Sequence, residues 1–143
     1  MLDRLYIEKF INKLLELTKA AKLDWQPIPR YFENHKNERF RHYIVAQNQY
    51  AYNYFAKGFS AQHPTINEYG SYCVEANGGL VILLNYEYPD PNQCRLAVQI
   101  DTMESVELLD CTSADLQKLN MIKKLIREDQ YSVARYIVSF LDE

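Results

Sequence analysis

Residues that could carry catalysis or bind a metal are few in this chain, and the one local set is a polar stretch with two histidines. His35 and His42 stand seven residues apart, with Glu38 between them. On a helix, seven residues make about two turns, so both imidazoles and the carboxylate could face one way. A zinc site would need a third and a fourth ligand at tight spacing, and no adjacent residue supplies them. We favour a solvated polar segment, and His35, Glu38 and His42 form the alternative candidate site.

The three cysteines are the other residues that could supply a nucleophile. Cys73, Cys94 and Cys111 are odd in number, far apart and without a CxxC pair. A Cys–His pair would need one thiol to approach a histidine in space, which the spacing does not indicate. We interpret them as reduced, buried thiols. A small hydrolase-like enzyme or metal-dependent binder that uses His35, His42 and a cysteine is the alternative function.

No motif in the sequence indicates nucleotide or cofactor chemistry. The chain lacks GxSxG, P-loop and GxGxxG sequences, and two of its four glycines fall in Asn77-Gly78-Gly79, so no glycine-rich loop remains to cradle a phosphate. Lys and Arg number 16 against 19 Asp and Glu, which gives a formal charge of -3. This charge provides no basic field for nucleic acid. We predict no cofactor and no metal, and duplex binding is disfavoured.

Tyrosine is the residue type that departs most from an ordinary composition. The chain has 12 tyrosines beside one tryptophan and six phenylalanines. A tyrosine ring combines a large contact area with a polar tip, which suits interfaces, although such rings also form the rim of a protein's own core. Stacking on single-stranded bases would need a positively charged groove, and only Lys36, Arg39 and Arg41 are basic near these rings. The predicted binding surface consists of Trp25, Tyr43, Tyr50, Tyr52, Tyr54, Tyr86 and Tyr88.

The stretch 70–110 must position much of this surface, and its pattern predicts an antiparallel β-meander. Asn77-Gly78 between apolar runs indicates a hairpin with a type I′ turn, which needs positive φ at both central residues. The run 80–88 reads as a central strand. Two more strands are expected at 94–101 and 105–110.

The central strand of this meander bears on function because it is apolar on both faces at its start. Val81 and Leu83 point to the face opposite Leu80 and Ile82. The outer face therefore also needs a cover, which favours self-association. The leading hypothesis is a non-enzymatic module that presents a Tyr-rich surface to a protein partner or to a second copy of itself.

Helices are predicted at both ends of the chain. Asp3 is a candidate N-cap for an amphipathic helix that runs to about Lys22. Thr112 and Asp115 form an Asp variant of the capping box at the start of a helix over 113–127. A second C-terminal helix is expected to bury Tyr131, Ala134, Val138 and Leu141.

Residues 30–69 fit two periods. The range 40–54 matches a helical stripe and, at its tyrosines, also the alternation of a strand. We favour strand or irregular structure after Tyr43, because aromatic and β-branched residues suit a half-buried pleated surface. Asn48 and Asn53 are also weak helix formers.

Together these elements predict one α+β domain over residues 1–143, in which an N-terminal helix and two C-terminal helices cover one face of the meander. The length of 143 residues suits a single domain. No signal-peptide pattern opens the chain, and no run approaches the roughly 18 apolar residues of a membrane span. We therefore expect a cytoplasmic protein with no membrane partner.

Two stretches give the chain a resemblance to known proteins. The first runs from Leu14 to Trp25 at the end of the opening helix, and the second runs from Gly70 to Gly79 into an apolar strand. This layout resembles small uncharacterised proteins of Gram-positive bacteria. The resemblance implies a cytoplasmic bacterial protein of unknown activity and transfers no catalytic residue.

Overall fold

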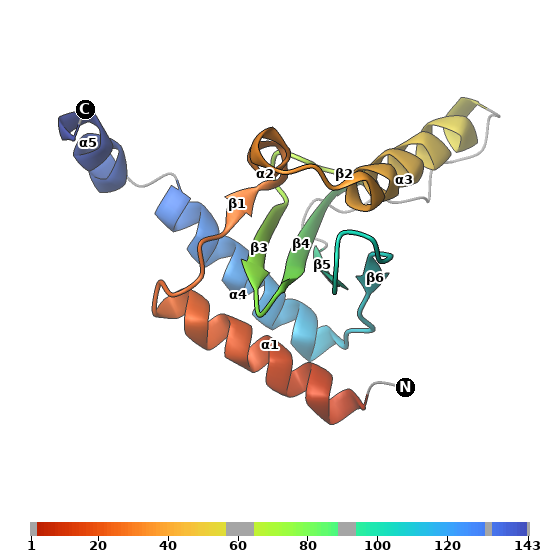
Figure 1. Cartoon of the computed structure of the whole chain (residues 1–143). Helices are drawn as coiled ribbons and strands as arrows, with labels where there is room; N and C mark the ends of the chain where they lie inside the picture. Colours follow the sequence, from red (N-terminus) through yellow and green to blue (C-terminus); the bar gives the residue numbers. More distant parts are fainter. Residues whose placement is uncertain (1–2, 57–64, 89–93, 131–132, 143) are drawn as a thin grey trace.

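The computed structural model describes residues 3–56, 65–88, 94–130 and 133–142, without the side chains of 49–56, 87–88 and 134. Its helices and strands form an α+β arrangement, as the sequence predicts (Figure 1). In chain order the elements are α1 (Arg4–Lys19), β1 (Gln26–Pro27), α2 (Ile28–Asn34), α3 (Glu38–Ala56), β2 (Thr65–Ile66), β3 (Tyr72–Ala76), β4 (Gly79–Tyr88), β5 (Cys94–Gln99), β6 (Glu107–Leu108), α4 (Ser113–Gln130) and α5 (Val133–Leu141).

The sheet is an antiparallel meander with one strand added at its edge. Within the described residues the strand order is β1-β3-β4-β5-β6, and β2 pairs with the C-terminal end of β4. The predicted corner between β3 and β4 is confirmed, since Asn77 has φ 52° and Gly78 has φ 79°. Pro89 and Pro91 predict a loop at 89–92, and these residues lie outside the description. β6 is shorter than the expected fourth strand.

Helices cover both faces of the sheet, which corrects the expectation of a cover on one face. On one face, Val81 and Leu83 of β4 pack in a core with α1 and α4. On the other face, Ile82 of β4 packs in a second core with α2 and α3 (Figure 1). The alternation along β4 is as predicted, but the chain itself supplies the second cover. The outer face of the sheet therefore gives no reason for self-association.

The second cover exists because residues 38–56 form helix α3, where we expected strand or irregular structure after Tyr43. Phe40 and Ile44 lie four residues apart and are fully buried, so they form one face of a helix on the sheet. Asn37 caps this helix, because its Oδ1 accepts a hydrogen bond from the Phe40 backbone N–H at 3.2 Å. Packing and capping thus outweigh the β-propensity of the tyrosines.

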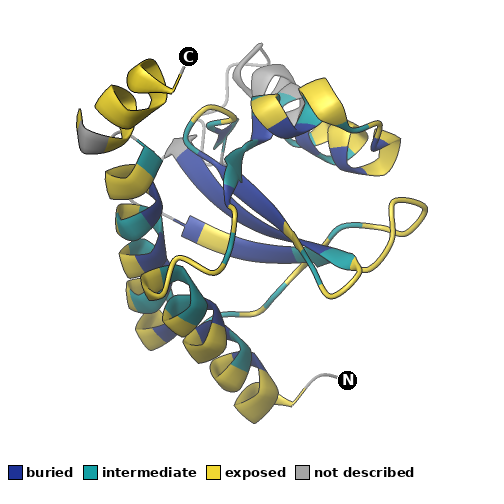
Figure 2. Cartoon of the chain, turned by 60° about the vertical axis from the view of Figure 1, so that its left-hand side comes forward, coloured by how far each residue is buried: buried dark blue, intermediate teal, exposed yellow. Residues whose placement is uncertain are grey.

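Helices α1 and α4 lie side by side, and an ion pair joins their starts (Figure 2). A capping box stabilises the start of α4. The predicted capping box is confirmed. The Asp115 backbone N–H donates to Thr112 Oγ1 at 3.2 Å, and the Thr112 backbone N–H donates to Asp115 Oδ2 at 2.9 Å. Arg4 also pairs with the buried Asp115 carboxylate. These hydrogen bonds lower the pKa of Asp115 against the opposing effect of burial.

Helix α1 ends three residues before the predicted Lys22, in a Schellman turn. The Lys22 backbone N–H donates to Leu17 O at 2.9 Å, and the Ala21 backbone N–H donates to Thr18 O at 3.1 Å. Ala21 takes φ 55° at the position that glycine usually fills. A left-handed conformation costs an L-residue roughly 1–2 kcal/mol.

We therefore expect Ala21→Gly to raise the free energy of unfolding by about 0.5–1 kcal/mol, after subtracting the entropy cost of glycine in the unfolded chain. Urea denaturation measures the change. The neighbouring Ala20 has φ -83°, so Ala20→Gly is the matched control and should destabilise the fold by a similar amount. Equal effects of the two substitutions would contradict the assignment of strain to Ala21.

Helix α5 does not cover the sheet, which corrects the prediction that both C-terminal helices do. It projects from the end of α4, away from the sheet, and its described residues are exposed (Figure 2). Val138 and Leu141, which we expected to be buried, are 56% and 74% exposed. Tyr131 and the side chain of Ala134 lie outside the description.

Candidate functional site

The histidine of the alternative site has a partner on the sheet. His35 Nε2 lies 2.8 Å from Glu75 Oε1, and its Nδ1 lies 3.0 Å from the backbone oxygen of Tyr31. The imidazole also stacks on the Tyr31 ring, with 4.4 Å between the ring centroids. These contacts attach the end of α2 to β3. They explain His35 as a structural residue between a helix and the sheet.

Glu38 and His42 are exposed on α3, and the carboxylate that His35 contacts belongs to Glu75 rather than to Glu38. In the described parts of the chain, no three His, Cys, Asp or Glu side chains gather in a way that could hold a metal ion. The structure therefore offers no coordinating arrangement around these three residues.

The cysteines lie in environments that suppress their reactivity. Cys73 and Cys94 are buried on opposite faces of the sheet. Burial raises the pKa of Cys73 to about 12 and that of Cys94 to about 11. Burial also raises the pKa of the half-buried Cys111. Because the thiolate is the nucleophile, these thiols are unsuited to covalent catalysis at neutral pH.

Two members of the predicted aromatic surface lie in the core instead. Trp25 is 4% exposed and packs under the end of α1, where its Nε1 donates to Thr18 Oγ1 at 3.1 Å. Tyr86 is 3% exposed, and burial raises its pKa to about 12. Both rings therefore stabilise the fold and offer no surface to a partner.

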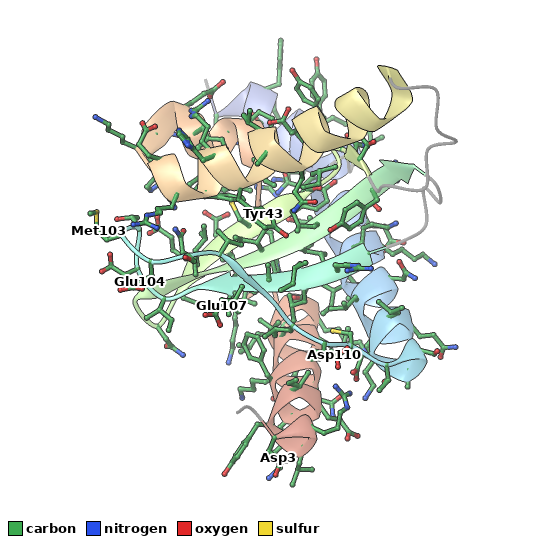
Figure 3. All side chains as sticks on the ribbon, turned by 90° about the vertical axis from the view of Figure 1, so that its right-hand side faces the viewer. Asp3, Tyr43, Met103, Glu104, Glu107 and Asp110 are labelled. Atoms are coloured by element: carbon green, nitrogen blue, oxygen red, sulfur yellow. The ribbon has the colours of Figure 1, made fainter. Side chains whose placement is uncertain are left out.

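Among the other tyrosines of that surface, only Tyr43 has a described side chain. Tyr43 is partly buried, and it lies on the side of α3 that faces the sheet (Figure 3). Its hydroxyl has no hydrogen-bond partner among the described residues. Tyr50, Tyr52 and Tyr54 belong to α3 and Tyr88 ends β4, but their side chains lie outside the description.

A buried amide pair closes the end of the sheet near the hairpin corner. Asn37 Nδ2 donates to Gln99 Oε1 at 2.7 Å, and Gln99 Nε2 donates to Glu104 O at 2.9 Å. Asn37 Nδ2 also donates to the Tyr31 hydroxyl at 3.0 Å. A polar cavity of about 370 Å³ lies over these residues. Since their polar atoms bond to one another, the cavity presents no unpaired buried group to a ligand.

The sheet edges are poor sites for a partner strand. β1 at one end of the strand order contains Pro27, and β6 at the other end contains the exposed Glu107. Figure 3 shows Glu104, Glu107 and Asp110 along the β6 side of the molecule. Short edge strands with proline or charge resist the addition of a further strand. A partner that avoids these two edges needs another surface.

An exposed apolar stripe lies on α5, the helix that we expected to pack on the sheet through Tyr131, Ala134, Val138 and Leu141. Its spacing of i, i+3, i+4, i+7 and i+8 places five large side chains along one face of the helix. They are 51–74% exposed. We call them the α5 stripe: Val133, Tyr136, Ile137, Phe140 and Leu141. The spacing is visible in the sequence, but periodicity does not say whether such a face meets its own chain or another one.

A second apolar surface lies between α1 and the β3–β4 hairpin. This groove has a volume of about 310 Å³ and is lined mainly by apolar side chains. Leu14 and Leu17 of α1, Leu23, and Ile100 after β5 are among them. We call it the α1–hairpin groove.

No helix in the described parts of the chain combines the length and the apolar character needed to cross a lipid bilayer. No protein-family model, curated protein or solved structure matches the chain. The resemblance to small bacterial proteins stays a prediction.

Proposed function

We propose that the chain is a non-enzymatic protein-interaction module that associates with a second copy of itself through the α5 stripe. The observation that carries this proposal is the exposure of five large apolar side chains on one helical face. Exposed apolar patches of this kind mark interaction sites. The alternative of a thiol or metal enzyme has no comparable support, because His35 is engaged by Glu75 and the pKa values of the cysteines are raised.

The size of the stripe suits a stable interface. With about 150 Å² for each large side chain, it exposes on the order of 500 Å², more than half of the roughly 800 Å² that one partner contributes to a standard interface. Tyr136 and Phe140 are aromatic anchors of the type that dominates binding energy. The polar residues Arg135, Ser139 and Asp142 fall on the opposite side of the helix.

Light scattering of the full chain during size-exclusion chromatography tests the proposal. We expect a dimer for the natural sequence. For Phe140→Glu we expect a dissociation constant raised by roughly 100-fold, because removing an aromatic anchor costs about 3 kcal/mol. Phe140 is 67% exposed, so the substitution should leave the fold intact.

Ser139→Glu is the matched control, since it adds the same charge to the opposite side of the same helix. It should leave the dimer in place. A natural sequence that stays monomeric at high concentration, or equal effects of the two substitutions, would refute the proposal.

A further inference from the structure

We infer that two copies exchange their α5 helices, so that the α5 stripe of each copy occupies the α1–hairpin groove of the other. This inference rests on the proposed self-association and names the surface that receives the stripe. One chain carries both an unpartnered apolar helix and an open apolar groove. Two such chains can satisfy each other reciprocally, which closes the assembly at a dimer.

The groove has the size and the lining that the stripe requires. An apolar cavity of about 150 Å³ holds a benzene ring, so the groove volume of about 310 Å³ accommodates two large side chains. Phe140 and Leu141 are adjacent in the stripe and are 67% and 74% exposed. An amphipathic helix that inserts anchors at i, i+3, i+4 and i+7 into an apolar groove is a recurring mode of recognition.

Charge sets the direction of docking. Lys13 lines the groove and its side chain is 61% exposed, although its Nζ already lies 3.7 Å from Glu16 Oε2 on the same helix. The C-terminal end of a helix carries partial negative charge on its last carbonyls, and Leu141 is the last residue of α5. Placing this end beside Lys13 sets opposite charges together and puts Phe140 and Leu141 over the groove.

The occupant we propose is the helix of a second copy rather than the chain's own. α5 projects away from the sheet, whereas the groove lies between α1 and the tip of the β3–β4 hairpin (Figure 1). A direct pairing of two α5 helices would leave both grooves open to water. Exchange covers the groove of each copy together with the Phe140 and Leu141 side chains of the stripe that enters it.

The test uses a groove variant beside the helix variant Phe140→Glu. Ile100 is 76% exposed and lies at the groove, so Ile100→Glu should fold normally and raise the dissociation constant at least about tenfold, as expected for loss of an interface anchor. Leu17→Glu, from the α1 wall, should act in the same direction. Met103→Glu is the matched control, because Met103 is 73% exposed on the same loop but does not line the groove.

Mixing the variants then separates exchange from other arrangements. Phe140→Glu keeps an intact groove and Ile100→Glu keeps an intact stripe, so an equimolar mixture should form a heterodimer more tightly than either variant self-associates. Sedimentation velocity with one variant fluorescently labelled measures this difference.

Three outcomes would overturn the inference. If Ile100→Glu and Leu17→Glu dimerise like the natural sequence while Phe140→Glu does not, α5 mediates self-association but the groove does not receive it. A mixture that stays monomeric would refute exchange. If the natural sequence is monomeric at every concentration, the proposed function fails together with the inference.

Discussion

Raising the pH from 8 to 11 is expected to lower the free energy of unfolding by about 5 kcal/mol through the ionisation of Cys73 and Cys94 alone. Each unit of difference between the folded-state and unfolded-state pKa corresponds to about 1.36 kcal/mol. Burial raises the folded-state pKa of these thiols from an ordinary 9.0 to about 12 and about 11. As the pH rises above 9, the unfolded chain loses the two protons first. The stability that the two buried, protonated thiols contribute is therefore complete below pH 9 and is lost as the pH approaches 11 to 12.

Urea denaturation at a series of pH values measures this loss. The double variant Cys73→Ala, Cys94→Ala should be less stable at pH 7, because it loses buried volume, and should show a much shallower decline above pH 9. Cys111→Ala is the control, since Cys111 is only half-buried, and it should retain most of the decline. A natural sequence equally stable at pH 8 and pH 11 would contradict the burial of the two thiols.

Replacing Asn37 with alanine is expected to cost about 3 kcal/mol of stability, the sum of a lost N-cap and of buried polar groups left without partners. Asn37 is 2% exposed, caps α3, and donates to Gln99 and Tyr31. The substitution leaves Gln99 Oε1 and the Tyr31 hydroxyl without this donor. It also releases the contact that joins the start of α3 to β5.

Chemical denaturation of Asn37→Ala measures the effect, and Asn34→Ala serves as its control. Asn34 is an exposed asparagine whose Nδ2 donates to Arg30 O at 3.3 Å, so its replacement should change stability by less than about 0.5 kcal/mol. Similar costs for the two variants would show that the buried amide pair contributes little to the fold.

The parts of the fold that could be predicted from the sequence are those that a few neighbouring residues determine. The Asn77-Gly78 corner needs only two residues that tolerate positive φ, and the Thr112–Asp115 capping box needs only a hydroxyl and a carboxylate three residues apart. Such local hydrogen bonding and backbone geometry do not depend on the rest of the chain.

Helix α3 could not be predicted in this way, because its stability comes from the sheet. Phe40 and Ile44 form a helix face only once Ile82 and its neighbours on β4 provide an apolar surface to bury them. The stabilisation from this burial and from the Asn37 cap then outweighs the local preference of the tyrosines for strand structure.

The candidate site was missed for a related reason. Apolar spacing in α5 predicts a face that must be covered, and we assigned the cover to the chain's own sheet. Helices α2 and α3 already occupy the sheet face opposite α1 and α4, so α5 has no place on the sheet. Two members of the predicted aromatic surface were missed in the opposite direction, since Trp25 and Tyr86 are core residues.

Sedimentation equilibrium of the natural sequence over a wide range of concentration tests most directly whether α5 is an interaction surface. We predict a reversible monomer–dimer equilibrium that Phe140→Glu shifts to monomer and Ser139→Glu does not. A single monomeric species of 16.9 kDa at every concentration would contradict it.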